Sequence, residues 1–160
     1  MRTSPLIPGE SLPELELTRS DGAVAELCDL LDKDRTLVYF MRTPTCPVCH
    51  SHLRQMTRTT FGGGALARRI VVVVPGDSND AATVAARHPE LSDRIVASAT
   101  AHESIGLFVR AGLQQSGTFV VDSARTVLTA RTATIPLGSF NEAEALEALG
   151  ETNAPATRTA

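Results

Sequence analysis

The fold is decided by residues 36–49, which read TLVYFMRTPTCPVC. The β-branched and aromatic run at 36–41 predicts a buried strand. The threonines and prolines that follow are typical of a helix start, and the helix is expected to continue to about Thr57. Two cysteines, Cys46 and Cys49, therefore stand where a buried strand ends and a helix begins.

The rest of the chain alternates between strand and helix patterns. Residues 70–74 are apolar on both faces, as a central parallel strand requires. The short turn at 122–125 makes the strands beside it antiparallel. Further strands are predicted at 15–17, 24–27, 94–97, 118–121 and 126–132, and helices at 28–31, 79–88, 101–109 and 141–149.

This order of elements predicts an α/β fold of three layers. A mixed central β-sheet is expected to be flanked by helices on both faces and preceded by a short N-terminal β-hairpin. Residues 1–150 are expected to form a single domain, and residues 151–160, which have no apolar side chain larger than alanine, a disordered tail.

Composition narrows the class of protein. The chain has 160 residues, 42% hydrophobic and 21% charged, which is ordinary for a globular domain. The net charge of -3 gives no reason to expect nucleic acid or an anionic membrane as partner. No apolar run is long enough to cross a bilayer, and residues 1–10 lack the apolar stretch of a secretory signal. We therefore expect a cytoplasmic protein whose three cysteines are thiols rather than a disulfide scaffold.

The position of the cysteine pair suits thiol chemistry. A thiolate is the reactive form, and Cys46 at a helix N-terminus faces free N–H groups and the positive end of the helix dipole. Arg42 and His50 are candidates to add positive charge beside it. Cys49 follows on the same helix face and can close a disulfide with Cys46. We interpret the pair as a redox dithiol in which Cys46, the more exposed thiol, attacks and Cys49 resolves; two cysteines that merely pack are the alternative.

Two other kinds of site would use the same residues. The run CPVCH at 46–50 matches the attachment pattern of c-type haem, which requires an exported chain. Cys46, Cys49, His50 and His52 could also contribute to a zinc site, although structural zinc ligands usually come from two separated segments. We expect no metal or organic cofactor, and a non-catalytic module that binds a metal, a haem or a partner protein is the alternative.

Several motifs resemble one family. Residues 8–13, PGESLP, resemble the N-terminal signature of the alkyl hydroperoxide reductase and thiol-specific antioxidant group, the peroxiredoxin-like redoxins of the thioredoxin fold. Residues 38–40 resemble its strand before the active site, and residues 116–122 its late strand. Thr43 stands three residues before Cys46, as a threonine or serine does in that family. The resemblance implies a thioredoxin-like fold, with Cys46 as peroxidatic cysteine and Thr43 orienting the thiolate and the peroxide.

The sequence also departs from that family at defined positions. Tyr39 stands where the peroxidatic motif has a proline, and Ser116 where the family has an arginine, for which Arg42 or Arg110 would have to substitute. Residues 44–49 also resemble thioredoxin-like proteins that assist disulfide formation in methylamine dehydrogenase. A protein disulfide oxidoreductase of the thioredoxin type, without peroxidase activity, is therefore the main rival.

The expected activity is that of an oxidoreductase that reduces hydroperoxides or disulfides. An external reductant, either a thioredoxin-like protein or a low-molecular-weight thiol, would reduce the Cys46–Cys49 disulfide again. The sequence is compatible with a homodimer. Cys28 is expected to pack in the core, with a role as distant resolving partner as the alternative. His50 and His52 are either solvated or tune the thiolate, and His88 and His102 are expected at the surface.

Overall fold

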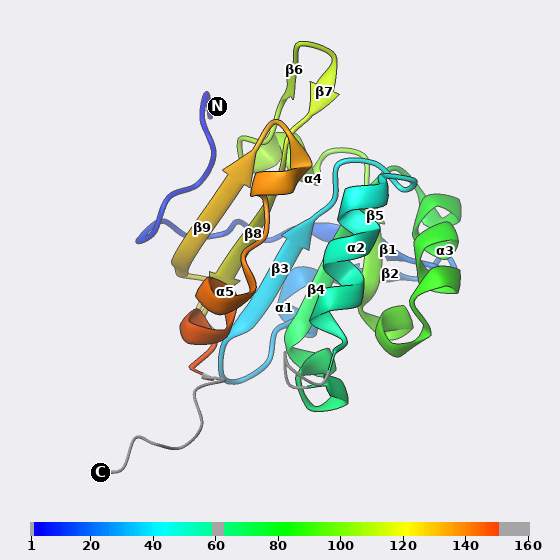
Figure 1. The fold of residues 1–160 in the computed structure, drawn as a ribbon, viewed down its shortest axis with the longest axis horizontal. Helices are drawn as coiled ribbons and strands as arrows, with labels where there is room; N and C mark the ends of the chain where they lie inside the picture. Colours follow the sequence, from blue (N-terminus) through cyan, green and yellow to red (C-terminus); the bar gives the residue numbers. More distant parts are fainter. Residues whose placement is uncertain (1, 59–62, 151–160) are drawn as a thin grey trace.

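A mixed sheet of seven strands forms the centre of the structure (Figure 1). The computed structural model describes residues 2–58 and 63–150, so the predicted tail lies outside the described residues. The order of strands is β2-β1-β5-β4-β3-β8-β9, with β3, β4 and β5 parallel and the others antiparallel to their neighbours. The strands are β1 (Glu16–Arg19), β2 (Val24–Glu26), β3 (Thr36–Phe40), β4 (Ile70–Pro75), β5 (Ile95–Ser98), β8 (Ser116–Val121) and β9 (Val127–Ala133).

Helices cover both faces of this sheet. Side chains alternate along β3, so Leu37 and Tyr39 face one core while Val38 and Phe40 face the other. Helices α2 (Pro47–Met56), α3 (Ser78–Arg87) and α5 (Glu142–Ala148) pack on the first face, and α1 (Leu27–Leu30) and α4 (Ala101–Ser104) on the second. Three 3-10 helices complete the described chain: η2 (Gly63–Arg69), η3 (Pro89–Arg94) and η4 (Pro136–Gly138). The predicted three-layer α/β fold is confirmed, and none of the described helices is long and apolar enough to span a bilayer.

The N-terminal residues form the predicted hairpin and an arm before it. Strands β1 and β2 pair antiparallel around a turn in which Gly22 has a φ of +92°. The arm crosses the second face of the sheet, where Leu6 and Leu12 are buried. It passes so close to Gly106 that a Cβ there would lie 2.0 Å from the carbonyl oxygen of Ser4. The arm is therefore part of the second core.

The predicted helix at 101–109 is wrong in its second half. Helix α4 ends at Ser104, and the chain then forms a small hairpin of β6 (Val109–Arg110) and β7 (Leu113–Gln114), which projects beyond the sheet in Figure 1. The two residues between these strands, Ala111 and Gly112, have φ values of +51° and +78°. Two successive positive φ angles are typical of a tight hairpin turn. Such turns are usually predicted from Asn, Asp or Gly at both positions, so the alanine gave no signal for a turn here.

Candidate active site

Cys46 is the residue that caps the N-terminus of α2. Its backbone is extended, Pro47 occupies the first helical position, and its sulfur accepts the backbone N–H of Cys49 over 3.2 Å. The cap thus directs a free helix N–H and the positive end of the helix dipole at the sulfur. The exposed fraction of Cys46 is 2%, so the sulfur is not open to solvent in this structure.

Cys49 lies one turn into α2 and is fully buried. Both cysteines are free thiols, and the backbone N–H of Cys49 joins it to the sulfur of Cys46. The sulfur of Cys49 also accepts the backbone N–H of Arg42 over 3.4 Å. Burial, followed by the hydrogen bond with Cys46, raises the pKa of Cys49 to about 12. Cys49 is therefore a protonated thiol at neutral pH, next to the sulfur it would have to join.

The loop between β3 and α2 brings the other predicted residues close to the pair. The carbonyl of Thr43 accepts the backbone N–H of Cys46 over 3.3 Å, which places Thr43 beside the cap. Arg42 contacts Cys49 through its backbone, while its side-chain Nε is buried without a hydrogen-bond partner among the described residues. The structure thus brings Arg42, Thr43, Cys46 and Cys49 together at the carboxyl end of β3.

A buried polar cluster lies beneath Cys49. The Tyr39 hydroxyl lies 2.7 Å from Nδ1 of His52. It is also close enough to Cys49 to lower the pKa of that thiol, against the larger effect of burial. Tyr39 is paired with Thr118 across β3 and β8, and Thr118 donates to the carbonyl of Ser139 over 2.6 Å. The Ser139 side chain hydrogen bonds to Tyr39 as well. Polar groups from β3, from α2 and from the segment before α5 therefore meet at the Tyr39 hydroxyl.

His50 belongs to a separate buried pair. Its Nε2 donates to the carbonyl of Pro44 over 2.8 Å, because a carbonyl can only accept, and its Nδ1 accepts from Nε2 of His88 over 2.7 Å. The two rings stack with an interplanar angle of 12°. Both nitrogens of His50 are thus used, so this arrangement leaves none to bind haem iron or zinc. The pair instead ties α3 to the loop that precedes Cys46.

The predicted surface position of His88 and His102 is wrong, and His50 and His52 do not take the solvated position that was one of their two alternatives. All four are buried: His50, His52, His88 and His102 have exposed fractions of 0%, 5%, 3% and 4%. His102 lies on the other face of the sheet, where its Nε2 donates to the carbonyl of Met41 over 2.7 Å at the end of β3. Burial lowers the pKa of each of these imidazoles. A hydropathy pattern does not distinguish such a histidine from a solvated one.

Cys28 is exposed, contrary to the core position that the sequence predicts. It lies in α1, directly after the N-terminal hairpin, beside Glu14 and Glu26. These carboxylates raise the pKa of its thiol, chiefly through a hydrogen bond with Glu14. Within the described residues, this exposed trio is the one group of three side chains spaced to hold a metal ion, and the Cys46–Cys49 pair is not in it.

Ser116 stands where the redoxins that the sequence resembles have an arginine. Ser116 is fully buried at the start of β8, and its hydroxyl has no hydrogen-bond partner among the described residues. Arg110, one candidate replacement, lies on β6 with its guanidinium 5.5 Å from the centre of the Phe108 ring. Arg42 is thus the candidate whose backbone already contacts the pair.

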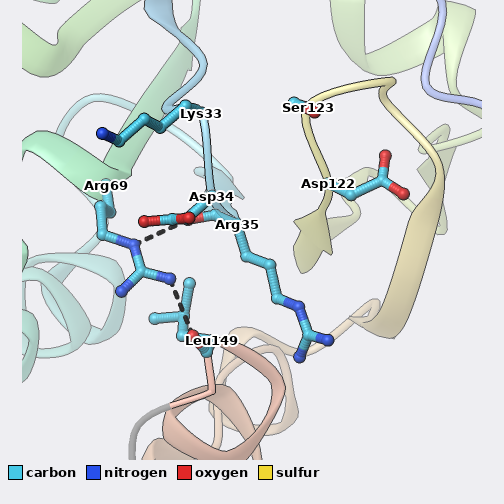
Figure 2. Close-up of a pocket in the computed structure, with 7 residues that line it drawn as sticks. All are labelled: Lys33, Asp34, Arg35, Arg69, Asp122, Ser123 and Leu149. Carbon is cyan, nitrogen blue, oxygen red and sulfur yellow. Dashed lines mark hydrogen bonds between the residues drawn. The ribbon is translucent and has the colours of Figure 1, made fainter.

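A polar pocket of about 370 Å³ lies at the opposite end of β3 from the thiols (Figure 2). Its guanidinium groups serve the C-terminal end of α5: Arg35 donates to the carbonyl of Ala148, and Arg69 to that of Leu149. Carbonyls at a helix C-terminus lack helical partners and favour cations. This pocket is therefore accounted for by helix capping.

Comparison with known proteins adds to this picture. No family model matches the sequence, and no curated protein matches it significantly. Similar solved structures include peroxidoxin BcpB from Mycobacterium tuberculosis, with a TM-score of 0.64 and 21% identity over 96% of this chain and 99% of that one. Reduced Prx3 from Vibrio vulnificus in complex with hydrogen peroxide has a TM-score of 0.69 and 18% identity over 90% and 99% of the two chains. The protein has a thioredoxin-like fold.

Peroxiredoxin 5 from Alvinella pompejana gives the same result, with a TM-score of 0.69 and 12% identity over 91% of this chain and 99% of that one. The predicted thioredoxin-like fold is thus confirmed, in the form that peroxiredoxins share. These likenesses span nearly the whole of each relative, so the N-terminal hairpin and the late strands belong to the shared architecture.

Sequence reasoning missed the role of one spacing. Cys46, Cys49 and His52 follow one another at intervals of three residues, which places them on the same face of α2. Tyr39 was predicted to lie in the core, and its burial is confirmed. The contact of its hydroxyl with His52 could have been sought from this helical spacing together with the side-chain alternation of β3.

Proposed function

We propose that the protein is a thiol-dependent oxidoreductase that reduces hydroperoxides or disulfides by cycling Cys46 and Cys49 between dithiol and disulfide. The observation that carries the proposal is the helix cap: the sulfur of Cys46 accepts the N–H of Cys49, which places the two cysteines side by side at the start of α2. This arrangement favours a thiolate at Cys46 and keeps a protonated thiol beside it. The peroxiredoxin-like fold supports the proposal.

With a hydroperoxide, the Cys46 thiolate would attack the terminal oxygen and break the O–O bond. The sulfur becomes a sulfenic acid, and the alcohol or water leaves with a proton. The sulfur of Cys49 then attacks the sulfenic sulfur, so the S–O bond breaks, the Cys46–Cys49 disulfide forms and water is released.

With a disulfide, Cys46 would form a mixed disulfide and expel one thiol, and Cys49 would expel the second as the intramolecular disulfide forms. In both routes two electrons leave the protein, and an external thiol, either a thioredoxin-like protein or a low-molecular-weight thiol, restores them. A homodimer is compatible with either route.

The two substrates can be separated by direct mixing. The reduced protein is mixed in a stopped-flow instrument with a hydroperoxide and, separately, with a model disulfide. Fast loss of thiols with the peroxide supports a peroxidase. Reaction with the disulfide alone supports the rival, a thioredoxin-type oxidoreductase. The buried Ser116 favours this rival, because it stands where the redoxins that the sequence resembles have an arginine. Reaction with neither would contradict the proposal.

Mild oxidation is expected to join Cys46 to Cys49. Because both lie in one turn of α2, the bond closes within a single peptide, with a mass loss of about 2 Da for two hydrogens. Peptide mapping by mass spectrometry checks this result. Cys28 should stay free, since it lies in α1 among carboxylates. A Cys28–Cys46 peptide would instead transfer the resolving role to Cys28.

Thr43→Val is expected to slow the reaction with peroxide by roughly tenfold or more. In the proposed mechanism the Thr43 hydroxyl donates to the thiolate and accepts from the O–H of the bound hydroperoxide. A hydrogen bond to an ionised group contributes about 1.5–3 kcal/mol. Disulfide exchange should slow less, because its transition state has no peroxide oxygen to orient. Stopped-flow rates with both substrates check the difference. Equal rates for the variant and the parent would reduce Thr43 to a residue of the helix entry.

A further inference from the structure

The second half of the proposed cycle needs a proton to leave a buried site. Cys49 is fully buried and its thiol is protonated at neutral pH, yet its sulfur must attack as a nucleophile. Reaction of a thiol with such a pKa is slow unless a base accepts the proton as the new S–S bond forms. The surroundings of Cys49 therefore decide how fast the disulfide closes.

Tyr39 and His52 supply a connected path for that proton. Cys49 and His52 lie one turn apart on α2. The Tyr39 hydroxyl, from β3, lies 2.7 Å from Nδ1 of His52 and interacts electrostatically with the Cys49 thiol. The Tyr39 and His52 rings meet edge to face with centroids 5.7 Å apart, and Phe140 packs against both. His52 keeps an exposed fraction of 5%, whereas Tyr39 and Cys49 have none. The path thus runs from the thiol toward the one member with access to solvent.

The charges around His52 suit a neutral base. Burial lowers the pKa of His52, and no charged side chain in the described part of the chain contributes to the shift. The titratable groups that face the path are Cys46 and Cys49 from α2 and Tyr39 from β3, with the Ser139 hydroxyl as a further hydrogen-bond partner. At neutral pH the imidazole is therefore uncharged and free to accept a proton.

We propose that Tyr39 and His52 form a proton relay that activates Cys49 for the resolving step. This proposal rests on the proposed function and assigns the base for its second half. The Tyr39 oxygen accepts the proton of the Cys49 thiol while the Tyr39 hydroxyl passes its own proton to Nδ1 of His52. The imidazole then releases a proton to solvent through Nε2. In the same step the Cys49 sulfur bonds to that of Cys46 and expels a thiolate, or a hydroxide that solvent protonates to water.

The relay is tested with 5,5′-dithiobis(2-nitrobenzoate), whose two coloured thiolates leave in separate steps. In a Cys28→Ser background, attack by Cys46 releases the first thiolate, and closure by Cys49 releases the second. Tyr39→Phe is expected to leave the first phase unchanged and to slow the second by roughly tenfold or more, the low end of what a positioned base contributes. Its second phase should then rise about tenfold per pH unit, because hydroxide must replace the relay.

His52→Asn separates the relay from a structural role. Asparagine keeps an acceptor for the Tyr39 hydroxyl but cannot take up a proton, so the second phase should again slow while the melting temperature changes little. Thr36→Val is the matched control: Thr36 is a buried hydroxyl at the other end of β3 that accepts the N–H of Asp32, and its loss should leave both phases intact.

The outcomes keep the two proposals apart. A normal first phase with an unchanged second phase in Tyr39→Phe and His52→Asn would overturn the relay and leave the redox cycle standing. A normal rate in His52→Asn alone would also overturn it, since the hydrogen bond rather than the base would then be what matters. If the parent protein shows no first phase, the redox cycle itself fails.

Discussion

Cys46→Ser is expected to abolish the reduction of both hydroperoxides and disulfides. A serine hydroxyl at the start of α2 could still accept the N–H of Cys49, so the helix should form as before. It is not ionised at neutral pH and is a weak nucleophile without a base. Loss of a catalytic nucleophile costs enzymes roughly 10³-fold or more in rate, and the remaining rate should match that of free thiols.

The exposed thiol provides the control for this experiment. Cys28→Ser removes the most accessible sulfur and should leave both activities unchanged, because Cys28 lies in α1, directly after the N-terminal hairpin. Cys49→Ser should behave differently from both, with one turnover at Cys46 and then an arrested sulfenic acid or mixed disulfide, detectable as a mass increase. Full activity in Cys46→Ser would show that the reacting sulfur lies elsewhere.

The second large effect is loss of stability in mild acid. Burial lowers the pKa of His88 and of His102 to about 4, with the neighbouring imidazole of His50 adding to the shift at His88. In the unfolded chain both titrate near the ordinary value of about 6.5. Between these values the unfolded state binds more protons, so the free energy of unfolding falls as the pH drops from about 6.5 to 4. Each imidazole contributes a loss of about 3 kcal/mol, against a total stability of roughly 5–15 kcal/mol.

Urea unfolding at a series of pH values measures this loss. His102→Gln keeps a side-chain N–H for the carbonyl of Met41 but does not titrate. The slope of the free energy of unfolding against pH should therefore be smaller in the variant by about 1.4 kcal/mol per pH unit, which corresponds to one proton. A free energy of unfolding that stays constant down to about pH 4 would contradict the buried, neutral state of these imidazoles.

The order of elements along the chain and the three layers could be predicted, because they depend on patterns that the sequence displays. The five apolar residues before Pro75 fit only a central strand, and β4 does lie between two parallel neighbours. Asn141 was recognisable as a helix cap, and its side chain accepts the N–H of Glu144. Each of these features is settled by residues close together in the chain.

The surroundings of the thiols could not be predicted in the same way. The contact of His50 with His88 joins residues 38 positions apart, and the bond from His102 to Met41 spans 61 positions. A histidine at a polar position reads as solvated unless its distant partner is known. The prediction for Cys28 was wrong in the opposite direction, because an apolar thiol was expected in the core and is exposed. Cys28 follows a buried residue on a short helix, and only the packing of α1 shows which face of that helix is exposed.

The acidic surroundings of Cys28 have a practical consequence for handling the purified protein. An accessible cysteine normally leads to covalent dimers during storage in air, since oxidation follows the fraction of thiol that is ionised. Here Glu14, Asp29 and Glu26 raise the pKa of that thiol, so little of it is ionised at neutral pH. A second molecule would also bring its own carboxylates against the first. The sample should therefore stay free of intermolecular crosslinks at neutral pH without added reductant, and should form them only in alkaline buffer.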